Sequence, residues 1–206
     1  MKKLVLIAIF CSLGVSEMNA QVTFKPGIRG GLNLTSITQS RGDFKPTFYV
    51  GALGEIKLTR RYGLQPEIIY SSQGSNNIIT ENYDYNTGVN FRSKKDVEIN
   101  YISLSMLNKF YIVNGFHAVV GPTLDFMVSD NLVAHDSDVD LGIGFGLGYT
   151  LPSGLTFEAR FKKGVVYVLE SEYYQSGSDF FFGDYNTNIL FQFGVSYAFN
   201  LKSKKE

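Results

Sequence analysis

Hydrophobic and polar residues alternate along most of this chain with the two-residue period of a β-strand. The clearest case is the segment NILFQFGVSYAF at residues 188–199. One face of this segment would be apolar and aromatic, and consists of Ile189, Phe191, Phe193, Val195, Tyr197 and Phe199. The other face is small and polar, apart from Leu190. A soluble sandwich with a core and a membrane barrel with a polar lumen would both accommodate such a strand.

The same alternation recurs along the chain, and no window after the first twenty residues keeps a helical period over three turns. The pattern predicts eight strands, over residues 25–34, 47–58, 63–73, 98–113, 116–128, 140–151, 155–162 and 188–199. A strand of about ten residues, rising roughly 3.3 Å per residue and tilted by about 40–45°, spans about 24 Å. That height is close to the apolar band of an outer membrane.

The predicted connections between strands alternate between short and long. The short ones cover residues 59–62, 114–115 and 152–154, and the long polar ones cover 35–46, 74–97, 129–139 and 164–187. Short turns at one end and long loops at the other are typical of outer-membrane barrels. We therefore predict an all-β fold, an eight-stranded antiparallel up-and-down transmembrane β-barrel. An even number of strands would leave both termini on the short-turn, periplasmic side.

The first twenty residues predict a cleavable signal peptide. Lys2 and Lys3 precede an apolar run over residues 4–15, and Ala20 offers a cleavage site before Gln21. The predicted domains are therefore a signal peptide at 1–20 and a barrel at 21–206, with a short basic tail at 200–206. The only cysteine is Cys11, so the mature chain would have no disulfide and no thiolate metal site.

Charged residues on the polar faces of the predicted strands favour a lumen that is filled by ion pairs. Five are basic and four acidic: Arg29, Lys57, Lys109, Arg160 and Lys162, with Glu55, Glu67, Asp125 and Glu158. In a membrane barrel these side chains face inward, because a Lys or Arg facing lipid costs about 2–4 kcal/mol at the midplane. In a soluble lipocalin-like barrel the same charges would face water, and this alternative stays open here. The alternating glycines at 142, 144, 146 and 148 would leave room for long side chains in a narrow lumen.

Several segments resemble one protein family. The most specific is LQPEIIYSSQG at residues 64–74, and others are GIRGGLN at 27–33, YISLSMLNKFY at 101–111, Gly121-Pro122 and FGVSYAF at 193–199. Together these segments resemble the PorT-like outer-membrane β-barrel proteins of Bacteroidota, over essentially the whole mature chain. The resemblance implies an outer-membrane location and an eight-stranded barrel. It departs at Ser105, where the family often has Pro, and at the C-terminus, where residues 200–206 follow the closing aromatic residue.

The sequence offers little for catalysis or cofactor binding. Only two histidines are present, His117 on a polar strand face and His135 in a predicted loop, and no GxSxG motif occurs. The run from His135 to Asp140 begins like an EF-hand loop, but Leu141 stands where that loop needs glycine. We therefore expect no enzymatic activity, no cofactor and no metal centre. Basic and acidic residues balance at 19 each, which gives no argument for nucleic acid.

Aromatic residues in the predicted long loops are candidate contacts for a partner, namely Tyr83, Tyr85, Tyr173 and Tyr174. They could equally belong to an interfacial aromatic girdle, or to strands that pair beyond the membrane. The expected function is that of a barrel with a filled lumen that acts as an anchor or interaction surface. Expected partners are outer-membrane lipid and other envelope or secretion proteins. The alternatives are a PorT-like component of a type IX secretion apparatus and a soluble periplasmic lipid-binding barrel.

Overall fold

The computed structural model describes residues 22–38, 40, 42–84, 88–132, 137–166, 168 and 187–200, without the side chains of residues 81–84. The predicted signal peptide lies outside these residues. The described strands are β1 (Thr23–Ile37), β2 (Lys45–Lys57), β3 (Tyr62–Asp84), β4 (Val89–Val113), β5 (Phe116–Asp130), β6 (Val139–Thr150), β7 (Leu155–Gly164) and β8 (Asn188–Ala198). In the described part of the chain, no helix is long and apolar enough to cross a membrane.

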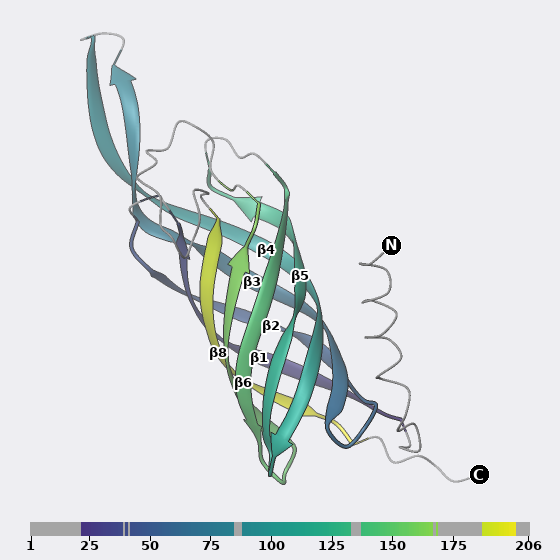
Figure 1. The fold of residues 1–206 in the computed structure, drawn as a ribbon. Helices are drawn as coiled ribbons and strands as arrows, with labels where there is room; N and C mark the ends of the chain where they lie inside the picture. The colour runs from purple at the N-terminus through teal and green to yellow at the C-terminus, as the bar shows by residue number, and fades with distance from the viewer. Residues whose placement is uncertain are drawn as a thin grey trace, which may run out of the picture.

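Each strand pairs antiparallel with the next one along the chain, and β8 pairs with β1 to close the barrel (Figure 1). The closing pairs run from Gly27 opposite Ala198 to Ile37 opposite Asn188. The prediction of an eight-stranded up-and-down barrel is therefore confirmed. The turn at Asn114 and Gly115 has positive φ at both residues, as a two-residue hairpin requires.

The long connection predicted at residues 74–97 is wrong. Strands β3 and β4 continue to Asp84 and Val89 and stand out beyond the barrel as a two-stranded hairpin (Figure 1). The pattern missed this hairpin because the described side chains of its outer part are mostly exposed on both faces, so hydrophobic and polar residues do not alternate there. Gly74, with φ of 140°, lies next to a register shift between Ser75 and Ile78, and the strand continues past it.

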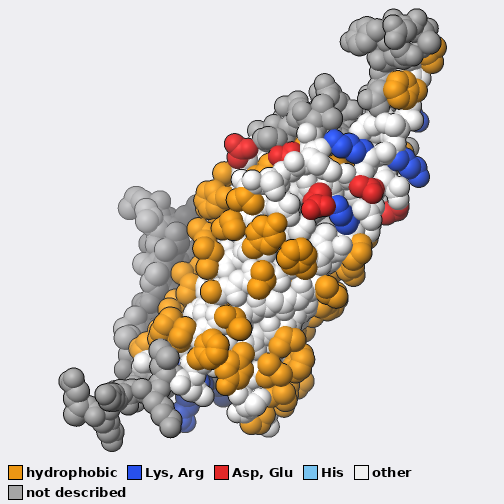
Figure 2. Space-filling view, turned by 180° about the vertical axis from the view of Figure 1, so that it is seen from behind, with side chains coloured by type: hydrophobic (Ala, Val, Ile, Leu, Met, Phe, Trp, Pro, Cys, Tyr) orange, Lys and Arg blue, Asp and Glu red, His pale blue; other side chains and the backbone are white. Residues whose placement is uncertain are grey.

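The two faces of the barrel wall differ in chemistry. Exposed apolar side chains cover its outside, among them Ile28, Leu32, Phe48, Ile68, Leu104, Phe145 and Phe193 (Figure 2). Polar and charged side chains point inward and are buried, among them Arg29, Asn33, Gln65, Glu67, Lys109, His117 and Arg160. The soluble lipid-binding barrel is therefore wrong, because that alternative needs an apolar interior and a polar exterior.

Aromatic pairs mark both ends of the apolar outer surface. Near the short turns, the rings of Phe116 and Tyr149 lie 4.7 Å apart and those of Tyr197 and Phe199 lie 5.2 Å apart. Near the long connections, the rings of Phe48 and Tyr70 lie 6.0 Å apart. Aromatic side chains prefer the level of the lipid headgroups. The two sets therefore mark the two membrane interfaces.

Two glycines in neighbouring strands make room for one inward-facing tyrosine. Gly31 lies opposite Tyr49 on one side and opposite Gly194 on the other. A Cβ atom at Gly194 would overlap the Tyr49 hydroxyl group and would lie 2.6 Å from the carbonyl oxygen of Gly30. The ring of Tyr49 therefore packs over a part of the wall that has no side chains.

We expect Gly194→Ala to lower the free energy of unfolding by about 1–3 kcal/mol, because the new methyl group overpacks the wall beneath Tyr49. Urea unfolding in lipid vesicles measures this change. Gly144→Ala is the matched control, since the atoms nearest to its added Cβ would be 3.8 Å away. Equal stability of the two variants would contradict the packing described here.

Candidate functional site

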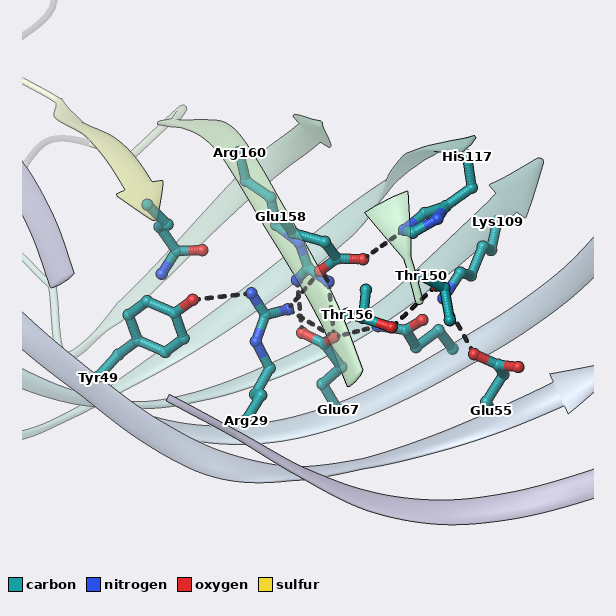
Figure 3. Close-up of polar contacts among 12 residues, drawn as sticks. Arg29, Tyr49, Glu55, Glu67, Lys109, His117, Thr150, Thr156, Glu158 and Arg160 are labelled. Carbon is teal, nitrogen blue, oxygen red and sulfur yellow. Dashed lines mark hydrogen bonds and ion pairs between the residues drawn. The ribbon is translucent and has the colours of Figure 1, made fainter. Parts of the chain in front are cut away.

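A four-residue charge cluster occupies the middle of the lumen, formed by Arg29 on β1, Glu67 on β3 and the pair Glu158 and Arg160 on β7 (Figure 3). Glu67 accepts two hydrogen bonds from Arg160, at 2.8 and 2.9 Å, and one from Arg29 at 2.8 Å. Glu158 lies 2.5 Å from Nη2 of Arg160 and 3.5 Å from Nη1 of Arg29. All four side chains are almost fully buried. Their contacts tie β1, β3 and β7 together across the lumen.

Strand alternation and register explain why these four side chains meet. Arg29, Glu67, Glu158 and Arg160 all occupy inward positions, and residues two apart on one strand share a face. Tyr49 adds a contact from β2, because its hydroxyl group accepts a hydrogen bond of 3.0 Å from Arg29. The Arg29 guanidinium also lies 5.1 Å from the centre of that ring.

A second layer of polar contacts lies toward the short turns (Figure 3). His117 on β5 places Nε2 at 2.9 Å from Glu158 and Nδ1 at 3.2 Å from the carbonyl oxygen of Gly115. Lys109 on β4 pairs with Glu55 on β2 at 3.0 Å. The central charges therefore continue toward this end of the barrel as paired groups.

A third polar layer lies toward the long connections. Lys162 pairs with Asp125, which also accepts a hydrogen bond of 3.1 Å from Gln73. Asn188 donates hydrogen bonds of 3.2 Å to Asp140 and to the Tyr101 hydroxyl group. This layer joins β3, β4, β5, β6, β7 and β8 by side-chain contacts.

Above the third layer, a buried apolar cluster occupies the long-connection end of the lumen. Its members are Ile37, Ile78, Val97, Ile99, Tyr101 and Val168, with Met127 and Leu132 packed against them. Ile78 and Val97 belong to the base of the β3–β4 hairpin, where these strands leave the barrel. The hairpin therefore contributes to the closure of the lumen as well as to the outer surface.

The space left between the polar layers is small. A cavity of about 20 Å³ lies beside Glu67, Ser103, Thr123, Arg160, Lys162 and Gln192. Holding one water molecule takes about 10–15 Å³ on this measure, so the cavity suits one water and no larger molecule. Eight strands enclose an interior that side chains can fill, and here they fill most of it.

The structure brings together eight of the nine residues that the sequence predicts for the lumen. Arg29, Glu67, Glu158 and Arg160 form the central cluster, Glu55 pairs with Lys109, and Asp125 pairs with Lys162. Lys57 lies apart from these pairs. Its side chain is exposed at the short-turn rim, with Nζ 4.8 Å from the centre of the Tyr111 ring.

The predicted loop contacts fall mostly outside the described residues. Tyr85, Tyr173, Tyr174 and His135 lie there, and Tyr83 belongs to β3 without a described side chain. Sequence reasoning also missed Tyr49, Asp140 and the apolar cluster. Tyr49 and Asp140 stand on the polar faces of their strands, so the alternation pattern could have identified them. The residues of the apolar cluster occupy inward positions although they are not polar, so the pattern could not identify them.

The arrangement is suited to holding strands together. Each carboxylate of the central cluster faces at least one guanidinium group, and His117 lies between a carboxylate and a carbonyl oxygen. Within the described residues, no group of three or more His, Cys, Asp or Glu side chains could hold a metal ion.

A closed barrel with an apolar outside and a charged, filled inside defines the class of transmembrane β-barrels. The chain belongs to the family described as "Outer membrane protein beta-barrel domain", whose model matches residues 19–170. It is therefore a protein of the outer membrane.

The solved structures that this chain is similar to have very different sequences. The crystal structure of neisserial surface protein A is 14% identical, covers 87% of this chain and all of its own, and has a TM-score of 0.51. OprG from Pseudomonas aeruginosa is 11% identical, covers 90% of this chain and all of its own, and has a TM-score of 0.49. At such low identity the similarity to neisserial surface protein A concerns the fold alone. No curated protein matches this chain in sequence.

We expect Glu67→Gln to lower the free energy of unfolding by about 3–5 kcal/mol, because it leaves two buried guanidinium groups with one carboxylate between them. Urea unfolding in lipid vesicles measures the loss. Lys57→Gln, at the exposed rim, serves as the control and should change stability by less than about 0.5 kcal/mol. A similar loss in both variants would show that the central cluster does not stabilise the barrel.

Proposed function

We propose that this protein is a non-enzymatic outer-membrane platform. Its filled barrel would act as a rigid anchor, and its long-connection end would present a surface to a partner. The observation that carries this proposal is the combination of a lumen filled by ion pairs with a hairpin that stands out beyond the barrel (Figures 1 and 3). A filled lumen argues against transport, and a protruding hairpin supplies a surface that the membrane does not cover.

The base of the hairpin is held firmly, which favours a role in recognition. Lys45 pairs with Glu98 at 3.2 Å, and Asn77 donates hydrogen bonds of 2.8 Å to Asp43 through its side chain and to Asp96 through its backbone. Asn131 donates a hydrogen bond of 2.9 Å to the carbonyl oxygen of Asp96. A surface that is ordered before binding loses less conformational entropy when a partner docks.

The outer part of the hairpin carries apolar side chains that the barrel does not bury. Val89 and Phe91 are both more than half exposed. Exposed aromatic residues on a polar surface are common anchors in protein recognition. We therefore place the partner contact on the hairpin, together with the candidate residues Tyr83, Tyr85, Tyr173 and Tyr174 from the long connections.

The proposed orientation puts both termini and the short turns in the periplasm and the hairpin outside the cell. The support is the pattern of outer-membrane barrels, in which periplasmic turns are short and extracellular loops are long. A predicted signal peptide at residues 1–20 would deliver the chain from the periplasmic side.

The filled lumen predicts that the protein forms no large stable pore. In planar lipid bilayers we expect no sustained open-channel current, because ion pairs fill the described part of the lumen and the cavity beside Glu67 and Arg160 holds about one water molecule. A heat-modifiable gel shift on the same sample would establish that the barrel is folded, and a known porin would serve as the positive control. A large, steady conductance would contradict the filled lumen.

Single cysteines test the orientation and the partner contact together, since the only native cysteine is Cys11 in the predicted signal peptide. We expect a membrane-impermeant maleimide to label Asn90→Cys on intact cells but to label Ser153→Cys only after the outer membrane is broken. Both positions are exposed, Asn90 near the end of the hairpin and Ser153 in the β6–β7 turn. The reverse labelling would overturn the orientation.

The same two cysteines then report on the partner. A cleavable crosslinker attached at Asn90→Cys should capture a protein at the cell surface that Ser153→Cys does not capture. Capture of secretion-machine subunits in stoichiometric amounts would favour the alternative role, a PorT-like component of a type IX secretion apparatus. That alternative draws its support from the sequence resemblance around residues 64–74.

A further inference from the structure

The two ends of the barrel carry different kinds of charge. At the short-turn end, the described basic residues are Lys25 at the start of β1, Lys57 at the end of β2, and Arg60 and Arg61 in the β2–β3 turn. Lys57, Arg60 and Arg61 are exposed, and Lys25 is half-buried. We call these four residues the basic rim.

The carboxylates nearest to the basic rim are already engaged. Glu55, which lies opposite Lys25, pairs with Lys109 at 3.0 Å. Glu158 pairs with Arg160 and His117 deeper in the lumen. Within the described residues, the basic rim therefore has more positive charge than its acidic neighbours balance.

The opposite end mixes basic and acidic groups. Lys45 pairs with Glu98, and Lys95 lies 2.5 Å from the carbonyl oxygen of Asn131. Figure 2 shows basic and acidic side chains interspersed near the upper end of that face, and basic side chains near its lower end. Among the residues that the structure describes, the excess of positive charge is thus a property of one end.

The depth of the basic rim indicates what it meets. Tyr62 follows Arg61 directly, and its ring lies 5.4 Å from that of Phe110. Such aromatic pairs sit at the level of the lipid headgroups. Arg61 and Arg60, one and two residues before Tyr62 in the turn, are therefore level with the phosphate groups of the adjacent leaflet.

The turn that carries the two arginines is held by several hydrogen bonds. The hydroxyl group of Thr59 accepts from the backbone nitrogens of Arg61 at 3.2 Å and Tyr62 at 3.0 Å. The carbonyl oxygen of Arg61 accepts from the backbone nitrogen of Tyr111 on β4, at 2.9 Å. The backbone that carries both arginines is thus fixed, and both side chains are exposed.

We propose that the basic rim binds the phosphate group of an anionic phospholipid in the periplasmic leaflet of the outer membrane, with Arg60 and Arg61 as the main contacts. A guanidinium group can give a phosphate two parallel hydrogen bonds. Lys25 and Lys57 add positive charge at the same end of the barrel. The proposal rests on the proposed orientation, in which the short-turn end faces the periplasm. An acidic protein is the less favoured occupant, because both arginines lie within two residues of Tyr62 and so stay at the level of the lipid headgroups.

Native mass spectrometry of the folded full-length protein in mild detergent tests this proposal. The probes are phosphatidylglycerol, which is anionic, and phosphatidylcholine of the same acyl chains, which carries no net charge. We expect the wild-type protein to retain several-fold more phosphatidylglycerol, and Arg60→Gln/Arg61→Gln to lose most of that preference. Arg60→Lys/Arg61→Lys keeps the charge and should retain much of it.

The matched control is Lys94→Gln/Lys95→Gln on the hairpin, which removes the same charge from two adjacent residues at the other end. The proposal predicts an unchanged lipid preference for this control. An equal loss in both double variants, or no preference in the wild-type protein, would overturn it. It would also be overturned if glycerol phosphate, the headgroup chemistry without acyl chains, competed as well as the lipid.

Cysteine labelling on intact cells separates this proposal from the orientation on which it depends. If labelling supports the orientation and the lipid preference is absent, only the lipid site fails. If labelling shows the reverse orientation while the lipid preference persists, the basic rim binds phosphate in the outer leaflet, and the periplasmic assignment fails.

Discussion

The hydrocarbon core of a membrane offers no partner for a backbone N–H or C=O group, and this constraint governs the whole barrel. A sheet satisfies it only when it has no free edge, so the pairing of β8 with β1 is the contact on which the other strands depend. Once the ring is closed, the number of strands determines the width of the interior. The apolar side chains must then face lipid, and every charge on a spanning strand must be accommodated inside.

The interior meets that requirement by pairing charges across strands. Glu67 accepts hydrogen bonds from both Arg29 and Arg160. Glu158 contacts the same two arginines and also His117. A buried ion pair stabilises only when its geometry is good and its remaining hydrogen-bonding groups are satisfied. Residues without side chains are as important as the charges, since Gly31 and Gly194 leave the space that Tyr49 occupies. Glycine residues thus leave the space that long side chains fill within a narrow lumen.

Much of this architecture could be predicted from the sequence, because a wall between lipid and a polar lumen imposes a strict two-residue period. The strands of the barrel and their number follow from that period. The inward position of Arg29 or Glu158 follows from the cost of a charge that faces lipid. The partners could not be predicted, since the contact between Arg29 and Glu67 depends on the register and on the curvature of the sheet. The outer part of the β3–β4 hairpin was missed because both of its faces are exposed. The role of Ile99 was missed because it is an apolar residue at an inward position near the end of the lumen.

The separation of the lumenal partners along the chain has a consequence for biogenesis. Glu67 and Arg160 are 93 residues apart in sequence, and Asn33 and Gln192 are 159 residues apart. Contacts between such distant residues form late and slow the search for the native state. An insertion intermediate that lacked β7 and β8 would leave Arg29 and Glu67 paired only with each other, without Arg160 and Glu158, in a low-dielectric surrounding. Incomplete barrels are therefore penalised by the same charges that stabilise the finished one, and this favours assembly as a single cooperative event.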